Sequence, residues 1–597
     1  GDAAGCVRSL ESPRGVGWLT GEAQIQRAAC LMDLDRDDEA AGILSAYLDD
    51  RLPAFHVARR TYEEAHEKAA NRLVEDARAG RLPEAVSNQL NAASEEKQGE
   101  IFRGWLSAEL DKDARLQALG AEYARYRDVV PASLALGTVE LKRSQRTAGE
   151  SRHGHLAAAE RAFLAIREEA EGAPSYHLEL AQVYHRLGKA KEGDAELSGL
   201  LARNDPDLTM DVAEVYRQLG IEDRARAILE KLYSGSADAA LKKRVAFQRA
   251  NAQRDIDDQE AWLEKADPND PSVRIQKLEN RAQRSLLAGR DEEADRAFRE
   301  AAASYDRDAK RSSAAVNNAA LAYLGRYAAT GDPQHRRAAL ARLESSLRLA
   351  PDSAIVHGNL AEALGDSAVD AALAGFVDLR VLRPSPGEGA TLFSALSRGP
   401  LRDRLRKALA AQADFLRART VSEREAVLSP NKPSVGMRQL RWLDWAGDAA
   451  GLRALEERLR QAPPDVGMIL ADREDWRSGR RDAVWRPRLA QGRSLAETRV
   501  KRARASGKRE TLAAALVLLA DAEDSLAKLE PGPAGIDRAV AACREAAAAW
   551  PEAGLEETLA DALLLSAAEH AAESSPEWRA RWTAERRRSS VSWALLE

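Results

Sequence analysis

A short helical pattern that recurs along the chain constrains the fold more than any other feature of the sequence. Residues 180–188 and 212–220 carry the same order of apolar, small and tyrosine residues, and both stretches end in glycine. Ala181 and Ala213 hold the same place in the two stretches, 32 residues apart. A repeat of this length is typical of arrays in which each unit buries its apolar face against the next one. Because a chain of 597 residues is too long for one hydrophobic core, we expect such an array.

Within each unit, two small residues lie twelve positions apart. Small side chains on two consecutive helices let the helices approach closely, and a large apolar residue four positions after the second small one lies on the same helical face. This order predicts antiparallel helix pairs that stack on one another. The small residues are Ala28 with Ala40, Ala181 with Gly193, Ala213 with Ala225 and Ala282 with Ala294, and the large residues are Leu44, Leu197, Leu229 and Phe298.

Glycines and prolines mark the ends of the predicted helices. Gly188, Gly220 and Gly289 each follow a first helix, where a positive φ angle ends a helix without a steric clash. Farther along, other segments repeat the pattern of a second helix with a closing proline. We predict a second helix at each of them: Ala339, Leu343 and Pro351; Ala372, Phe376, Leu379 and Pro384; Ala539, Cys543, Ala546 and Pro551.

This pattern resembles the tetratricopeptide repeat (TPR), a two-helix unit of about 34 residues. The resemblance is to degenerate, bacterial-type arrays, since most units lack the first-helix tryptophan and the unit around Tyr323 carries an insertion that contains residues 331–333. Only 5% of the residues are aromatic, and Ala, Leu, Glu and Arg dominate, which favours helix over strand. The resemblance implies an all-α fold, a superhelical TPR-like α-solenoid of stacked antiparallel helix pairs.

The strength of the repeat pattern varies along the chain and predicts a division into five segments. The pattern is clearest in the middle, weak between residues 55 and 150, and interrupted by prolines and tryptophans after residue 418. The predicted segments are an N-terminal arm (1–20), divergent helical repeats (21–150), a TPR-like solenoid (151–417), an irregular basic helical segment containing tryptophans (418–510) and a C-terminal helical repeat or cap (511–597).

Charge and cysteine content narrow the class of protein. The formal net charge is −6 with 31% charged residues, so both signs are mixed and any site for a polyanion must be local. Cys6, Cys30 and Cys543 have neither metal-ligand nor CxxC spacing, which argues against a disulfide framework and a zinc cluster and favours a reducing compartment. We therefore expect a cytoplasmic protein. A periplasmic or lipid-anchored form requires an upstream signal, and no apolar run is long enough to predict a transmembrane helix.

The sequence contains no local signature of catalysis. The HExxH metal helix, the phosphate-binding loop, the GxSxG elbow and the dinucleotide fingerprint are all missing. Cys543 occupies a packing position, where buried cysteines are usually inert. We therefore predict no enzyme, no cofactor and no metal site. A further alternative is the regulatory half of a protease or kinase system, because some bacterial TPR arrays precede such domains.

The TPR resemblance also implies a place for partner binding, since the first helices of such an array line a concave groove. Asn318 lies two residues before Ala320 and Asn359 two before Ala361, the place from which TPR asparagines hydrogen-bond a bound peptide backbone. The alternative is that both are helix-surface asparagines without a role. The function we prefer is a non-enzymatic protein–protein interaction scaffold or adaptor that binds an extended segment or helix of a protein partner in the groove.

The alternative function rests on a basic segment. Residues 473–509 contain thirteen Lys plus Arg against four Asp plus Glu. Trp476 and Trp485 could stack on bases while Arg480 and Arg481 neutralise phosphates, as in proteins that bind single-stranded nucleic acid. The chain would then be a periplasmic or nucleic-acid- or polysaccharide-associated TPR scaffold. An exposed basic face, or one that contacts an acidic protein, explains the segment more simply.

Overall fold

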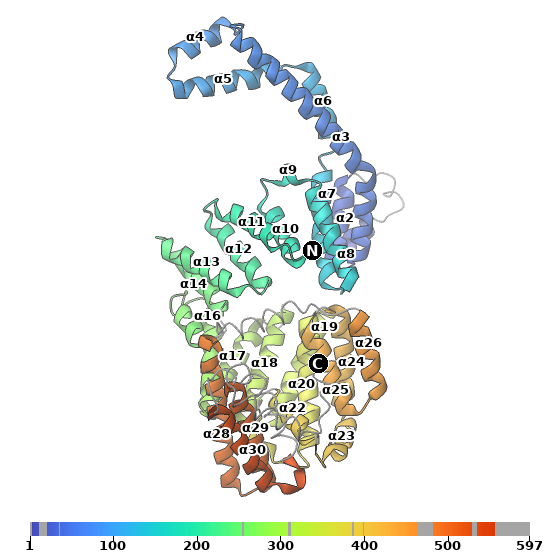
Figure 1. Ribbon diagram of the computed structural model, residues 1–597, viewed down its shortest axis with the longest axis vertical. Coiled ribbons are helices and arrows are strands. Elements are labelled where there is room, and N and C mark those ends of the chain that lie inside the picture. The colour runs from blue at the N-terminus through green and yellow to red at the C-terminus, as the bar shows by residue number, and fades with distance from the viewer. Residues whose placement is uncertain are drawn as a thin grey trace, which may run out of the picture. The chain divides into compact units, whose positions relative to one another are not determined.

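The computed structural model of the chain is entirely helical in the residues that it describes, which contain no β-strand (Figure 1). This confirms the predicted all-α fold. The helices form two compact units: unit 1 comprises residues 1–145 and 150–215, and unit 2 comprises residues 146–149 and 216–597. The structure describes residues 3–10, 21–34, 36–147, 149–252, 256–308, 312–384, 387–397, 399–430, 432–461, 482–527 and 534–555.

Unit 1 begins with helices that enclose a small apolar core. Ala28, Leu31, Ala40, Leu44 and Val139 are all fully buried in it. The helices of this part of the chain are α1 (Ala3–Leu10), α2 (Gly21–Asp33), α3 (Asp37–Arg78), α4 (Glu84–Ala92), α5 (Glu95–Leu110), α6 (Ala114–Ala124), α7 (Val129–Gln145), α8 (Gly149–Leu164), α9 (Arg167–Ala170), α10 (Pro174–Arg186), α11 (Ala190–Leu201) and α12 (Pro206–Gln218).

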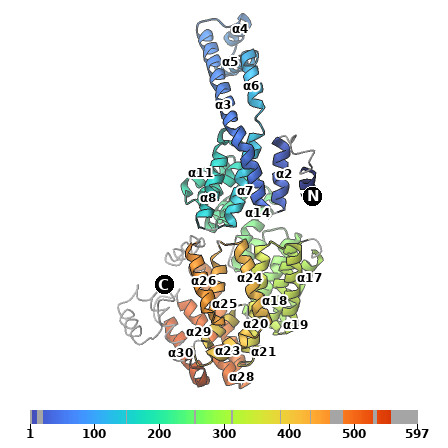
Figure 2. The ribbon, with the colours of Figure 1, turned by 90° about the vertical axis from the view of Figure 1, so that its right-hand side faces the viewer.

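One helix of unit 1 is far longer than a repeat helix. α3 runs for 42 residues and continues through Pro53. Its second half extends beyond α2, with α4 and α5 at its far end, and α5 and α6 pack against it (Figures 1 and 2). No residue of α4 is buried, and Leu110 is the only buried residue of α5. The segment that we predicted as divergent repeats therefore includes a helical arm that has little core of its own.

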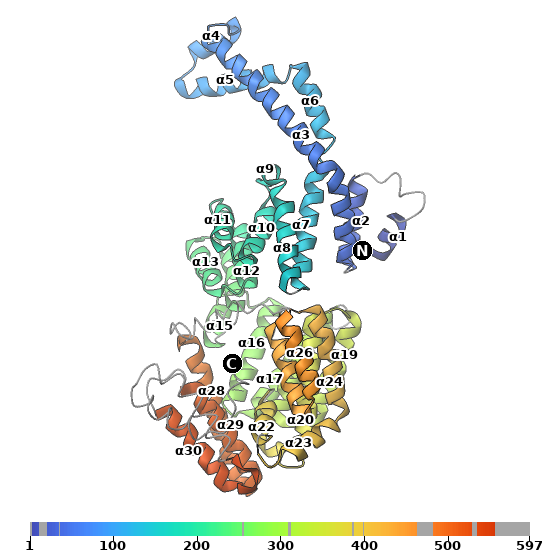
Figure 3. The ribbon, with the colours of Figure 1, turned by 45° about the vertical axis from the view of Figure 1, so that its right-hand side comes forward.

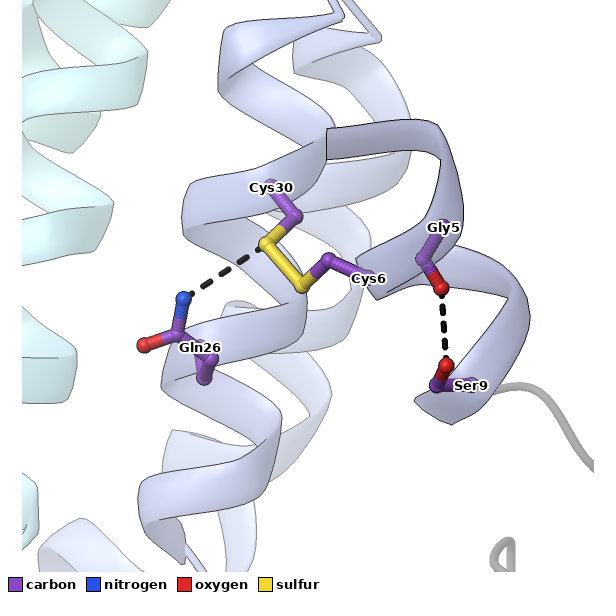
Figure 4. The surroundings of a disulfide bond; sticks show 5 residues. All are labelled: Gly5, Cys6, Ser9, Gln26 and Cys30. Carbon is purple, nitrogen blue, oxygen red and sulfur yellow. Dashed lines mark hydrogen bonds between the residues drawn. A yellow bond between two sulfur atoms is a disulfide. The ribbon is translucent and has the colours of Figure 1, made fainter. Parts of the chain in front are cut away.

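The two cysteines of the N-terminal region form a disulfide bond, which corrects the prediction from cysteine spacing. Cys6 of α1 is bonded to Cys30 of α2, and the amide of Gln26 lies beside the Cys30 sulfur (Figure 4). Spacing along the chain missed this pair because α1 lies against α2, which brings residues 24 positions apart together. The preference for a reducing compartment therefore loses its basis.

The small residues predicted to bring helices together are buried. Ala28, Ala40 and Ala181 are completely inaccessible to solvent. Gly193 shows why size matters, because a methyl group placed on it would lie 2.5 Å from the His185 ring and 3.0 Å from the Ala181 carbonyl oxygen. The glycines of the predicted turns, Gly188, Gly220 and Gly289, have φ angles of 78°, 76° and 70°. The helix-pair pattern read from the sequence is thus correct at these positions.

Unit 2 continues the series of helix pairs. α16 packs on α17, α17 on α18, α18 on α19 and α19 on α20, as Figure 2 shows for the last of these. Its helices are α13 (Glu222–Gly235), α14 (Ala239–Asn251), α15 (Ile256–Leu263), α16 (Pro271–Leu287), α17 (Asp291–Asp308), α18 (Ser313–Thr330), α19 (Pro333–Leu349), α20 (Ala354–Leu373), α21 (Leu379–Leu382), α22 (Glu388–Leu396), α23 (Arg402–Ala410), α24 (Ala413–Leu428), α25 (Pro433–Ala446), α26 (Ala449–Gln461), α28 (Asp482–Ser506), α29 (Arg509–Ala527) and α30 (Ala534–Ala549).

Side-chain caps define where the central helices of unit 2 begin. Ser312 accepts a hydrogen bond from the Ala315 amide and starts α18, and Ser353 does the same for α20. Asp332 caps α19, whose first residue is Pro333, and Gly331 ends α18 with a φ angle of 71°. Of the residues in the predicted insertion, Gly331 and Asp332 are therefore the turn between two helices, and Pro333 begins the second helix.

The second helix that pairs with α20 is not the one predicted from the sequence. Ala372 belongs to the end of α20, and Leu379 belongs to the single-turn helix α21. The partner of α20 is α24, which follows an insertion that spans residues 374–412 (Figure 3). The two helices are antiparallel, because Ser367 near the end of α20 donates to Asp414 at the start of α24 (2.9 Å). The prediction was wrong because Ala372 and Leu379 reproduce the required spacing without forming one helix.

The last described helices of unit 2 return to its earlier ones. α28 packs against α16 and α21, and α29 packs against α21 and α22. Arg499, only 1% exposed, holds α28 in place by donating to Glu388 (2.6 Å) and to the carbonyl of Arg383 (3.2 Å). Asp291, the first residue of α17, pairs with both Arg383 and Arg502. The C-terminal helices are thus part of the same packed unit as α16–α20.

Candidate partner-binding site

The two asparagines singled out in the sequence lie on neighbouring first helices of unit 2. Asn318 is on α18 and Asn359 is on α20, and both side chains are partly exposed. Each precedes by two residues a fully buried alanine, Ala320 or Ala361, which packs in the core. The burial of these alanines fixes the rotation of each helix, so the asparagines have equivalent places on their helices.

A third asparagine connects them. The Asn359 amide nitrogen donates to Oδ1 of Asn317 (2.8 Å), and the Asn317 amide nitrogen donates to Oδ1 of Asn318 (3.2 Å). Asn317 itself is buried. We call Asn317, Asn318 and Asn359 the asparagine row. Asn317 was not among the predicted site residues, although its position beside Asn318 is visible in the sequence.

The hydrogen-bond chain continues from α18 to the preceding helix pair. The Asn318 amide hydrogen-bonds to the oxygen of Tyr305 on α17, and the Tyr305 hydroxyl donates to Oε1 of Glu279 on α16 (3.0 Å). Burial raises the pKa of the Glu279 carboxyl, although the hydrogen bond from Tyr305 opposes this. Burial, together with the Glu279 charge, raises the pKa of Tyr305. One polarised chain of donors and acceptors therefore crosses four helices and ends at a carboxyl group.

Asn280 on α16 has the same place in its helix as Asn318 and Asn359. It lies two residues before the fully buried Ala282, and it is itself only 3% exposed. Its amide nitrogen is buried and has no hydrogen-bond partner among the described residues. The spacing of Asn280 to Ala282 is the sequence signal from which this residue could have been predicted. Asn280 thus occupies the equivalent position on α16, but because it is buried it adds nothing to the exposed part of the row.

An ionic cluster near Asn359 joins α20 to α24 and α25. Arg438 of α25 pairs with Glu362 of α20 (2.7 Å) and with Glu425 of α24. Glu425 is fully buried, and burial raises the pKa of its carboxyl against the opposing charges of Arg438 and Lys432. The Glu425 carboxylate also lies against Gly358, where a methyl group would come within 2.6 Å of it. The asparagine row is therefore supported at this end by buried charges.

The chemistry of the row is that of primary amides, which carry both hydrogen-bond donors and acceptors and no charge. Asn359 makes one hydrogen bond with described residues, so its oxygen and one of its N–H groups face no protein partner there. In the described part of the chain, no group of three or more His, Cys, Asp or Glu residues is arranged to hold a metal ion. Cys543 is buried in α30, and burial raises the pKa of its thiol to about 12.

The remaining candidate residues lie largely outside the described residues. Trp476, Arg480 and Arg481 fall in the undescribed stretch 462–481, and the side chain of Trp485 in α28 is not described either. Described cations of the same basic segment pair with carboxylates of unit 2. Arg499 pairs with Glu388, Arg502 with Asp291, Arg504 with Glu545 and Lys508 with Asp378. These four charges are neutralised within the fold. No described helix is both long and apolar enough to cross a membrane.

Comparison with known proteins found no matching family model and no matching curated protein. Among solved structures, the human IFIT1 dimer with m7Gppp-AAAA is 13% identical with a TM-score of 0.33, and the match covers 77% of this chain and 90% of that one. The APC/C hetero-tetramer Cut9–Hcn1 is 12% identical, with a TM-score of 0.29 and coverages of 84% and 98%. Naa15/Naa10 bound to HypK-THB is 12% identical, with a TM-score of 0.23 and coverages of 95% and 96%. None of these similarities bears on what this chain binds.

Proposed function

We propose that unit 2 is a non-enzymatic interaction scaffold that binds an extended segment or a helix of a protein partner along the asparagine row. The continuous hydrogen-bond chain from Asn359 through Asn317 to Asn318 carries this proposal. Side chains that hydrogen-bond one another are held in fixed orientations, so they lose little rotamer entropy when a partner binds. A row held in this way is prepared for binding, whereas isolated surface asparagines are not.

The amide group also fits the proposed ligand. A peptide backbone offers alternating N–H donors and C=O acceptors whatever its sequence, and a primary amide can satisfy both. The exposed parts of Asn318 and Asn359 lie on adjacent first helices, so one extended segment could contact both. Ile355 and Leu321, on the same two helices, are 67% and 42% exposed and offer apolar area beside the amides. Together these groups favour a protein partner over a polyanion, since none of them is positively charged.

Quantitative affinity capture from native lysate tests the proposal. The full chain, the Asn318→Ala/Asn359→Ala variant and the control Asn88→Ala/Asn91→Ala are compared, because the control asparagines are exposed on α4 in unit 1. We expect a protein partner that survives nuclease and moderate salt and binds about thirtyfold more weakly to the first variant, since each of the two lost hydrogen bonds contributes roughly 1 kcal/mol. Equal recovery by both variants contradicts the role of the row. A partner that depends on nucleic acid supports the basic segment instead.

A further inference from the structure

Unit 2 contains a second candidate site, a cavity of about 790 Å³ that is separate from the asparagine row. It lies where the last turns of α18 and α20 meet the first turns of α19 and α29. Tyr327 and Asp370 line it, whereas Asn318 and Asn359 lie near the opposite ends of the same two helices. We call it the arginine cavity, and its proposed role goes beyond the function proposed above.

The cavity wall carries charges of both signs. Its cations are Arg336, Arg337, Arg380 and Lys508, and its carboxylates are Asp370, Asp378, Asp414 and Glu510. Each carboxylate already has a cation close by. The pairs are Asp370 with Arg336, Asp378 with Lys508, Asp414 with Arg417 (3.5 Å) and Glu510 with Arg509 (3.8 Å). The negative charge of the wall is thus compensated within the protein.

Arg337 and Arg380 are the cations of this wall that no described carboxylate pairs with. Both side chains are exposed, and neither forms an ion pair or a side-chain hydrogen bond with a described residue. Each guanidinium group presents a planar fork of N–H donors that matches a carboxylate. The cavity therefore offers two guanidinium groups that have no ion-pair partner among the described residues.

The wall behind them is held rigidly. The Arg336 guanidinium lies over the Tyr327 ring at 3.8 Å, and the Tyr327 hydroxyl donates to Oδ2 of Asp370 (2.9 Å). Arg336 also pairs with Asp370, yet its Nε is buried without a hydrogen-bond partner among the described residues. On the far side, the Asp378 amide donates to Thr511 of α29 (3.0 Å), which ties the loop after α20 to the C-terminal helices. The cavity is thus built from segments that the fold brings together.

The lining favours a peptide over a polyanion. A compact polyphosphate or a nucleic-acid strand carries more negative charges in a small space than the two arginines without an ion-pair partner among the described residues can match. Apolar groups complete the wall: Leu340, Ala371, Ala374, Phe376, Val377 and Leu379. We propose that the arginine cavity binds an acidic peptide segment of a protein partner, with carboxylates on Arg337 and Arg380 and an apolar side chain against Leu340 and Phe376.

Selection of displayed random dodecapeptides on the full chain tests this proposal, followed by fluorescence polarisation with the selected peptides. The test variant is Arg337→Gln/Arg380→Gln. The control is Arg348→Gln/Arg402→Gln, which removes the same charge from exposed positions on α19 and α23. We expect peptides rich in Asp and Glu that bind the test variant about tenfold or more weakly, because two charge-assisted hydrogen-bonding groups are lost. The control should bind them as the unmodified chain does.

Three results would overturn the proposal. The first is a selection that yields no acidic peptides, and the second is equal binding of the selected peptides by the test and control variants. The third is pyrophosphate binding that requires Arg337 and Arg380 and is tighter than that of any peptide, which would assign the cavity to a small phosphate-containing anion. The Asn318→Ala/Asn359→Ala variant should still bind the selected peptides. The two experiments therefore distinguish a failure of the proposal for the asparagine row from a failure of the proposal for the arginine cavity.

Discussion

Replacing Arg438 by methionine tests how far buried charges hold the end of the asparagine row together. Arg438 is 5% exposed and joins Glu425, which is fully buried, to Glu362, which is 63% exposed. Without the guanidinium, the Glu425 carboxylate stays in the core with Lys432 at 3.7 Å as its nearest cation. Breaking a buried pair by removing one partner costs about 3–5 kcal/mol, because an uncompensated charge remains. We expect the free energy of unfolding to fall by this amount at pH 8 in the Arg438→Met variant.

The loss should depend on pH in a definite direction. The folded-state pKa of Glu425 is already raised, and removing Arg438 raises it further. The folded protein then binds a proton more tightly than the unfolded chain, so stability falls as pH rises through the interval between the unfolded and folded pKa values. The Arg438→Met variant should therefore recover part of its stability as the pH falls from 8 to 5 and Glu425 takes up protons.

Hydrogen exchange measured by mass spectrometry on peptides from α24 and α25 reports the local opening free energy directly. The control is Arg417→Met on α24, because Arg417 pairs with Glu344 at an exposed site and its loss should cost no more than about 1 kcal/mol. The double variant Arg438→Met/Glu425→Gln should regain about 2 kcal/mol of the loss, since the buried charge is gone. A small cost for Arg438→Met that does not change with pH, or no recovery in the double variant, would refute this reasoning.

Three further predictions follow from single residues. Gly137→Ala should be about 1–3 kcal/mol less stable than Gly154→Ala in thermal unfolding, because both gain helix propensity but only the first places a methyl group 2.5 Å from the Phe163 ring. The free energy of unfolding of the unmodified chain should fall as the pH rises from 5 to 8, because the pKa of the Glu279 carboxyl is raised. Glu279→Gln should show a smaller fall in urea titrations, since glutamine does not titrate but still accepts a hydrogen bond from Tyr305. Cys543 should resist iodoacetamide at pH 8 in the native chain and react once it is unfolded, as mass spectrometry would show, because burial raises its thiol pKa to about 12.

Local spacing predicted the parts of the fold in which a helix pair is contiguous in sequence. Ala28 with Ala40 and Ala181 with Gly193 are such cases, because the two helices of each pair follow one another across a short turn. The pattern fails where the second helix is distant in sequence, as for α20, whose partner α24 begins at Ala413. A spacing rule cannot reveal an insertion that carries short helices of its own.

The candidate site was predictable to a similar extent. Asn318 and Asn359 were found from their spacing to a buried alanine, and the same rule applied once more would have found Asn280. Asn317 and the link to Tyr305 and Glu279 depend on how neighbouring helices pack, which residue spacing does not contain. The arginine cavity could not be predicted for the same reason. Arg337 and Lys508 line one cavity only because the C-terminal helices pack against earlier helices of unit 2.

The insertion between α20 and α24 has a consequence for the order in which unit 2 forms. Roughly 40 residues separate the two helices, whereas two residues separate α18 and α19. Closing the longer connection costs about 2–3 kcal/mol more in chain entropy, so α20 should dock first on α19 and receive α24 late. During synthesis, Asn359 leaves the ribosome well before the helix that completes its own pair. Until α24 arrives, the side of α20 that α24 covers is left for a chaperone or a neighbouring chain to contact.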